Sequence, residues 1–71
     1  MHMSTRIILN GKQIQLPDDV SNITQLLKWR GIPAMGTAVA INSNVIPAAR
    51  HASTPLADLD IVTIISAAYG G

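Results

Sequence analysis

The sequence of 71 residues contains no cysteine, no glutamate and no phenylalanine. Without cysteine the chain cannot form a disulfide, a thiolate zinc site or an iron–sulfur cluster, and it has no thiol nucleophile. The lack of cysteine also fits a reducing compartment, so we expect a cytoplasmic location. Any chemistry that involves this chain must therefore use other groups.

Aromatic residues and excess charge are scarce as well. Trp29 and Tyr69 are the only aromatic residues, which leaves almost no surface on which nucleic-acid bases could stack. Five Lys and Arg residues stand against four Asp residues, so no basic stripe exists to bind a phosphate backbone. No apolar run approaches the length of a membrane span. We therefore expect neither a nucleic acid nor a membrane as a partner.

Potential metal ligands are few. His2 and His51 lie far apart in the sequence, and no pattern of carboxylates accompanies them. We therefore expect no metal site, and we expect His51 to lie on the surface.

The length of the chain limits its architecture. A chain this short forms one modest core, which buries roughly 60% of the surface that the unfolded chain exposes, and it has no room for a deep active site. We predict a single domain over residues 1–66, with residues 1–4 either left over from cloning or disordered. Residues 67–71 are expected to form a flexible tail that ends in two glycines. We expect no catalytic residue and no bound cofactor.

The first half of the chain contains clear signals for a hairpin and a helix. Two strand-like runs, 6–9 and 12–16, flank Asn10-Gly11, the dipeptide that best fits a two-residue hairpin turn. Asn22 is a good helix N-cap, and Gly31 is a typical residue for ending that helix. The sequence thus predicts a β-hairpin followed by a short amphipathic helix.

The second half is predicted to consist mainly of strands. Runs rich in Ile, Val and Ala indicate strands at 37–41, 45–46 and 61–66, and Thr54-Pro55 favours a short helical turn over 54–57. This order of elements favours an α+β fold of the β-grasp (ubiquitin-like) type. Such a fold has a mixed sheet of four to five strands, with one main helix on one face and with the first and last strands as parallel neighbours.

A series of short motifs then resembles a known family. In chain order the motifs are Asn10-Gly11, Asn22-Ile23, Leu26-Leu27, Ala38-Val39-Ala40-Ile41-Asn42, Ile46-Pro47, Asp60 and Gly70-Gly71. Together they resemble the ubiquitin-like sulfur carrier proteins, most closely the ThiS type of thiamine biosynthesis. The family usually has glycine before the Asp that opens the last strand, whereas Leu59 precedes Asp60 here. We therefore expect this turn to avoid positive φ.

The resemblance implies a role for the C-terminal glycines. An E1-like adenylyltransferase would consume ATP to adenylate the carboxylate of Gly71, and a cysteine desulfurase and sulfurtransferase relay would convert it to a thiocarboxylate. Thiazole synthase would then accept the sulfur. Gly70 provides clearance, and Ala67, Ala68 and Tyr69 form the rest of the segment that enzymes bind. The protein is in this view a cosubstrate and not an enzyme.

A second hypothesis concerns docking to these enzymes. Alternation along the last strand places Ile61 and Ile65 on one face, and Val62 and Ile64 on the other. Since a single helix covers one face only, aliphatic side chains remain for an interface, and we consider Ile8, Val62, Ile64 and Ile65 as its candidates. The alternative is that neighbouring side chains and loops cover them.

Two other functions fit the same pattern. The small subunit of molybdopterin synthase also ends in two glycines and carries sulfur, although it tends to be longer, with a proline-rich approach to the tail. A ubiquitin-like modifier or a β-grasp binding module is the third interpretation. Mass spectrometry of the C-terminus after reaction with an activating enzyme distinguishes sulfur transfer from conjugation.

Overall fold

A computed structural model describes residues 5–66, so the expected extension over residues 1–4 and the tail over residues 67–71 lie outside the described residues. Within the described part, five strands form one sheet in the order β2-β1-β5-β3-β4. Strands β1 and β5 are parallel, and the other neighbours are antiparallel. The elements are β1 (Arg6–Leu9), β2 (Lys12–Gln15), α1 (Ile23–Arg30), β3 (Thr37–Ile41), β4 (Asn44–Ile46), the 3₁₀ helix η1 (Ala48–Arg50) and β5 (Asp60–Ser66).

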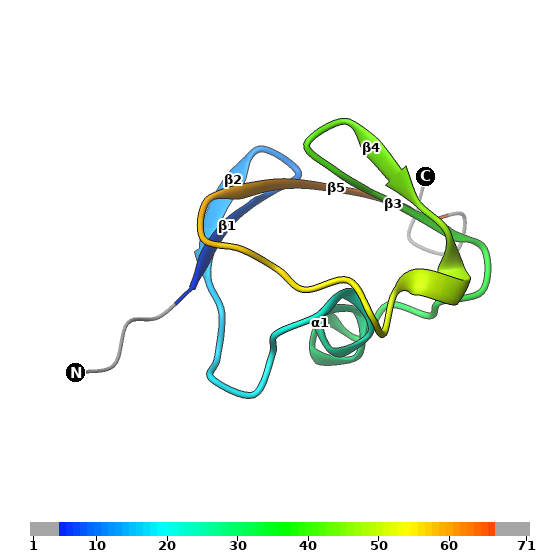
Figure 1. The fold of residues 1–71 in the computed structure, drawn as a ribbon, viewed down its shortest axis with the longest axis horizontal. Helices are drawn as coiled ribbons and strands as arrows, with labels where there is room; N and C mark the ends of the chain where they lie inside the picture. The colour runs from blue at the N-terminus through cyan, green and yellow to red at the C-terminus, as the bar shows by residue number, and fades with distance from the viewer. Residues whose placement is uncertain (1–4, 67–71) are drawn as a thin grey trace.

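The helix lies against one face of the sheet. Figure 1 shows α1 on one side of the curved sheet, with the two hairpins and β5 above it. The mixed sheet, its single helical layer and the parallel pairing of β1 with β5 confirm the predicted α+β β-grasp fold. Because only one face is covered, the fold leaves a second sheet face free of helix.

Both hairpins turn through residues with positive φ. Asn10 and Gly11 have φ values of 48° and 84° between β1 and β2, as expected for a type I′ turn. Asn42 and Ser43 have φ values of 50° and 73° between β3 and β4. The second turn thus adopts the same geometry without a glycine.

The helix begins and ends at the residues that the sequence indicated. The Asn22 side chain accepts a hydrogen bond from the backbone N–H of Gln25 (2.8 Å), and Gln25 Oε1 accepts one from the backbone N–H of Ser21 (2.7 Å). Gly31 adopts the left-handed conformation (φ 71°) and donates to the carbonyls of Leu27 and Lys28. These caps satisfy backbone groups that an eight-residue helix would otherwise leave unpaired.

The core lies between α1 and the inner face of the sheet. Its largest fully buried side chains come from both layers and are Ile7, Ile23, Leu26, Val39 and Val62. Burial of these side chains holds the short helix in place, because a helix of this length is only marginally stable by itself.

The predicted helical turn at 54–57 is wrong. Pro55 instead forms an isolated antiparallel bridge with Asn22, and the N–H of Leu56 donates to the carbonyl of Ser21 (2.8 Å). The side chain of Leu56 is buried in the core. A proline suits an extended segment as well as the first turn of a helix, and here the burial of Leu56 favours the extended form.

The turn before β5 also differs from the expectation, because Leu59 has a φ of 67°. The turn is closed by the Asp60 carboxylate, which accepts from the N–H of Ala57 (2.8 Å), and by the N–H of Asp60, which donates to the carbonyl of Ala57 (3.1 Å). The N–H of Leu59 donates to the carbonyl of Arg6. These bonds hold Leu59 in the conformation for which glycine is better suited.

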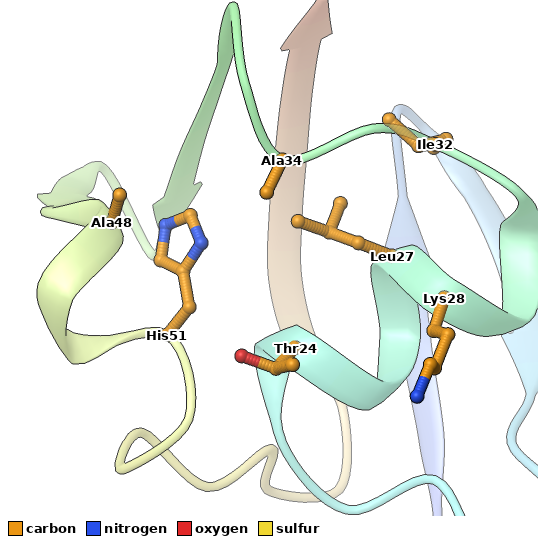
Figure 2. A pocket seen from close by; sticks show the side chains of 7 residues that line it. All are labelled: Thr24, Leu27, Lys28, Ile32, Ala34, Ala48 and His51. Atoms are coloured by element: carbon orange, nitrogen blue, oxygen red, sulfur yellow. The ribbon is translucent and has the colours of Figure 1, made fainter.

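The expected surface position of His51 is wrong as well. Its side chain is only 3% exposed, and it lies between η1 and α1 (Figure 2). The ring atom Nε2 is 3.0 Å from the carbonyl oxygen of Ile46. Since a carbonyl only accepts, Nε2 donates this bond, which connects the loop after η1 to the end of β4.

Candidate functional site

Strand β5 precedes residues 67–71, and Asn10 fixes one edge of this strand. After β1 ends, the N–H of Asn10 donates to the carbonyl of Val62 (2.9 Å). The Asn10 side chain then makes two bonds to the backbone of Ile64: Oδ1 accepts from its N–H (2.8 Å) and Nδ2 donates to its carbonyl (3.2 Å). One asparagine amide therefore continues the pairing that β1 leaves incomplete.

The other side of β5 is paired with β3 up to its last residue. Thr37 lies opposite Ser66, and their hydroxyl oxygens are 3.0 Å apart. The Thr37 hydroxyl also donates to the carbonyl of Pro33. Ser66 is buried. The chain therefore enters residues 67–71 from a fixed point, and the predicted site residues Gly71, Gly70, Tyr69, Ala68 and Ala67 lie outside the described residues.

The uncovered side of the sheet carries exposed aliphatic side chains beside the polar side chains of Gln13 and Thr63. We call it the outer sheet face and define it by Ile8, Val45, Ile61 and Ile65. Ile61, Ile65 and Val45 are 55%, 68% and 74% exposed, and Ile8 is half-buried. The register places these residues on one face, because Ile8 pairs with Ile61 and Val45 pairs with Ala40, which lies opposite Thr63. Small side chains thus lie between the larger aliphatic ones.

The structure corrects two of the docking candidates. Val62 is 0% exposed and Ile64 is 7% exposed, so both belong to the core under α1 and cannot contact a partner. Their alternation with Ile61 and Ile65 was predicted correctly, but the docking hypothesis placed them on the uncovered surface. Of the original candidates, Ile8 and Ile65 lie on the outer sheet face.

An apolar hollow of about 590 Å³ lies beside the end of β5. The strongly exposed side chain of Met35 contributes to its wall together with Ile65 and Ala38. Sequence reasoning missed both Met35 and Val45. Two signals could have identified them. Met35 is an apolar residue in the short loop 33–36, and Val45 alternates with Ile46 in a short strand, which places the two side chains on opposite faces.

One ion pair stands at the start of the sheet. The Arg6 guanidinium contacts the Asp58 carboxylate at 3.0 Å, and the backbone N–H of Arg6 donates to the same carboxylate (2.8 Å). Hydrogen bonds from the Arg6 side chain, followed by that from its backbone, lower the pKa of Asp58 below its ordinary value. The same pairing raises the pKa of Arg6. This pair secures the loop before β5 to β1.

Other kinds of site find little support in the described part of the chain. Within residues 5–66, no three side chains of His, Cys, Asp or Glu gather closely enough to hold a metal ion. Among the same residues, no helix has the length and apolar character needed to cross a membrane. The features that remain are the fixed end of β5 and the outer sheet face beside it.

Comparison with known proteins identifies the family. A model of the ThiS family matches residues 5–71. The chain belongs to the ThiS family. The crystal structure of the thiamine biosynthesis protein ThiS from Geobacter metallireducens has a TM-score of 0.78 and 26% sequence identity to this chain, covering 94% of this chain and 100% of that one. The solution NMR structure of a thiamine biosynthesis protein from Geobacter metallireducens has a TM-score of 0.73 and 25% identity, covering 86% and 81% of the two chains. No curated protein matches the sequence.

Membership of the ThiS family confirms the resemblance inferred from the sequence motifs. The chain is a ThiS-type sulfur carrier of thiamine biosynthesis, and small carriers of this type are not enzymes themselves. The family also implies that partner enzymes act on the carrier. The site of interest is accordingly the part of the chain that such enzymes hold and modify.

Proposed function

We propose that this ThiS family member carries sulfur as a thiocarboxylate on Gly71 and delivers it to thiazole synthase. The family match extends through residue 71 and includes Gly70-Gly71, and this observation carries the proposal. Two glycines remove every side chain from the end of the sequence, which suits a narrow enzyme channel. In the proposal Gly70 provides clearance, and Ala67, Ala68 and Tyr69 complete the segment that enzymes bind.

The proposed chemistry requires activation of a poor acyl donor. A carboxylate oxygen of Gly71 attacks the α-phosphorus of ATP on an E1-like adenylyltransferase, and pyrophosphate leaves. The terminal sulfur of a persulfide on the cysteine desulfurase and sulfurtransferase relay then forms a C–S bond as the C–O bond to AMP breaks. A second thiol of the partner enzymes cleaves the resulting acyl disulfide, which releases the thiocarboxylate and leaves an enzyme disulfide. The carrier binds no cofactor of its own in this scheme, because ATP is consumed by the partner. We propose the cytoplasm as the place of reaction.

Chain geometry limits where these enzymes can bind. The five residues after Ser66 span at most about 18 Å when fully extended. The reaction centre of each enzyme must therefore come within this distance of the end of β5. An enzyme that encloses the tail at this range also approaches the outer sheet face and the hollow beside Ser66.

The exposed aliphatic side chains support a docking role for that face. Ile8, Ile61 and Ile65 come from the two neighbouring strands β1 and β5, and Val45 extends the surface toward the edge. Exposed aliphatic side chains that gather on a face without a covering layer are typical of an interaction site. We propose that the outer sheet face docks both the adenylyltransferase and thiazole synthase, which then bind the carrier in turn.

Mass spectrometry of the intact chain tests the sulfur-transfer step. Incubation with ATP, the cognate adenylyltransferase and a sulfur source should replace one terminal oxygen by sulfur. The matched control is the chain without Gly71, which retains the whole described domain but ends one residue earlier. We expect it to stay unmodified, with unchanged thermal stability.

Two results would contradict the proposal. If the adenylyltransferase is active and the full chain keeps its carboxylate, the carrier does not receive sulfur at Gly71. An isopeptide adduct to a lysine would instead indicate a ubiquitin-like modifier.

A further inference from the structure

A second hollow lies on the helix side of the sheet, between α1 and the segment that includes η1 (Figure 2). Its volume is about 250 Å³. Its apolar walls are formed by Leu27, Ile32, Ala34 and Ala48. Typical sites for drug-sized ligands start at roughly 300 Å³, so this hollow suits a molecule no larger than a single substituted ring.

His51 places one polar atom against these apolar walls. The imidazole is almost fully buried, and its Nε2–H donates to the carbonyl of Ile46 (3.0 Å). In the neutral ring Nδ1 is therefore the unprotonated nitrogen and a hydrogen-bond acceptor. Figure 2 shows this second ring nitrogen directed toward the side of Ala34 and Leu27. No described residue donates a hydrogen bond to it.

The charges around the hollow restrict the ligand further. Lys28 and Thr24 also line the hollow, and no Asp residue is among the residues that line it. A cationic ligand would meet the Lys28 ammonium without a compensating carboxylate. Within residues 5–66 no buried side-chain nitrogen or oxygen lacks a hydrogen-bond partner, so Nδ1 is open to water in the hollow. A ligand that displaces this water leaves the acceptor unpaired unless it donates a hydrogen bond itself, so a ligand with one donor for Nδ1 is favoured.

We propose that this hollow binds a small, uncharged aromatic molecule that carries one O–H or N–H donor, as phenol does. The ring packs against Leu27, Ile32 and Ala48, and the donor bonds to Nδ1 of His51. The hollow lies on the helix side of the sheet, and its test involves no step of sulfur transfer, so it can be tested on the carrier alone.

The test uses phenol and toluene as a matched pair of probes. Toluene has nearly the same shape as phenol but no hydrogen-bond donor. We follow the ¹⁵N resonance of His51 Nδ1 in the His2→Gln chain, in which His51 is the sole histidine. The titration is run at about pH 8, where an ordinary imidazole is neutral. We expect phenol to shift this resonance to a plateau, with a Kd on the order of 1 mM. The affinity is low because so small a ligand has few atoms in contact with the protein.

Neighbouring alanines of η1 provide matched variants. Ala48→Leu places a larger side chain in the hollow and should weaken phenol binding about tenfold, which is a modest steric penalty. Ala49→Leu adds the same side chain at an exposed position that does not line the hollow, and it should bind phenol normally. Ala34→Leu fills the opposite wall and serves as the second filling variant if Ala48→Leu does not fold.

The proposal is overturned by any of three results. The first is that phenol leaves the Nδ1 resonance unchanged, and the second is that phenol and toluene bind with equal affinity. The third is that a folded Ala48→Leu or Ala34→Leu variant binds phenol as well as the unmodified chain does. Amide spectra of each variant establish that it is folded. None of these outcomes depends on sulfur transfer, so the two proposals can fail separately.

Discussion

Leu59 occupies a backbone conformation that most residues avoid. It has a φ of 67°, its side chain is partly exposed, and its N–H bonds to the carbonyl of Arg6. A Cβ in this region costs about 1–2 kcal/mol, whereas glycine adopts it freely at some cost in chain entropy. We expect Leu59→Gly to have a free energy of unfolding about 0.5–1 kcal/mol higher than that of Leu59→Ala, measured by urea denaturation.

The comparison with alanine isolates the backbone effect. Both variants remove the Leu59 side chain, so they lose the same packing, and they differ only in the Cβ. Equal stability of the two variants would contradict the prediction, because the strain of the Cβ would then not exceed the chain entropy that glycine loses on folding.

Asp58 gives the stability a dependence on pH. Its pKa in the folded chain lies below the ordinary value of 3.8, chiefly because of hydrogen bonds from the Arg6 side chain. A lowered folded-state pKa stabilises the fold above the ordinary pKa, and this contribution is lost as the pH falls through the folded-state pKa. We therefore expect Asp58→Asn to lower the Tm at neutral pH, with a difference that shrinks below pH 4.

A charge control accompanies this measurement. Asp19→Asn removes one carboxylate from the exposed loop before α1, and it should leave the Tm nearly unchanged at neutral pH. A Tm difference for Asp58→Asn that persists unchanged down to pH 2 would contradict the role of the ion pair.

Strand β5 depends on a side chain at the end of another element. The Asn10 amide makes two hydrogen bonds to the backbone of Ile64 from the first hairpin turn. Asn10→Gly retains the positive φ of the turn and removes both bonds, so it should lower the free energy of unfolding by about 1–2 kcal/mol. Amide exchange of Ile64 should accelerate at the same time, because its N–H loses its acceptor.

The second hairpin supplies the matched substitution. Ser43 also has a positive φ in a two-residue turn, but no side-chain bond to β5 depends on it. Ser43→Gly should therefore be neutral or slightly stabilising. If both glycine variants lose stability equally, chain entropy explains the effect, and the Asn10 amide contributes nothing.

The elements that could be predicted are those in which one residue type meets a local requirement. Asn10-Gly11 specifies a positive-φ turn, and Gly31 ends the helix, so the first hairpin and α1 were identified from sequence alone. The segment 54–57 was not, because a proline fits two conformations and the burial of Leu56 decides between them. His51 was misplaced for a similar reason: its burial depends on how η1 packs against α1.

At the scale of the whole molecule, the same limit applies to the candidate site. Alternation separates Ile61 and Ile65 from Val62 and Ile64, but it does not tell which set lies under the helix. That choice is made by the handedness of the crossover from β2 through α1 to β3, together with the packing of α1. The structure resolves it and leaves Ile61 and Ile65 on the outer sheet face.

The outer sheet face leads to a prediction about partner choice. Ile65 lies next to the buried end of β5, and its side chain is 68% exposed, so a charge at this position would be desolvated by any enzyme that encloses the following five residues. We expect Ile65→Asp to weaken binding to both the adenylyltransferase and thiazole synthase at least about tenfold, as for a central interface residue. Titration calorimetry with each enzyme measures the effect.

A matched charge at a distant position completes this experiment. Ala52→Asp introduces the same carboxylate on an exposed loop after η1, outside the strands that pair with β5, and it should bind both enzymes normally. Both variants should keep the Tm of the unmodified chain, since neither side chain is in the core. If Ile65→Asp binds both enzymes with unchanged affinity, the outer sheet face contributes no binding free energy at this position. The docking proposal would then be wrong, and the enzymes would recognise the carrier through its tail alone.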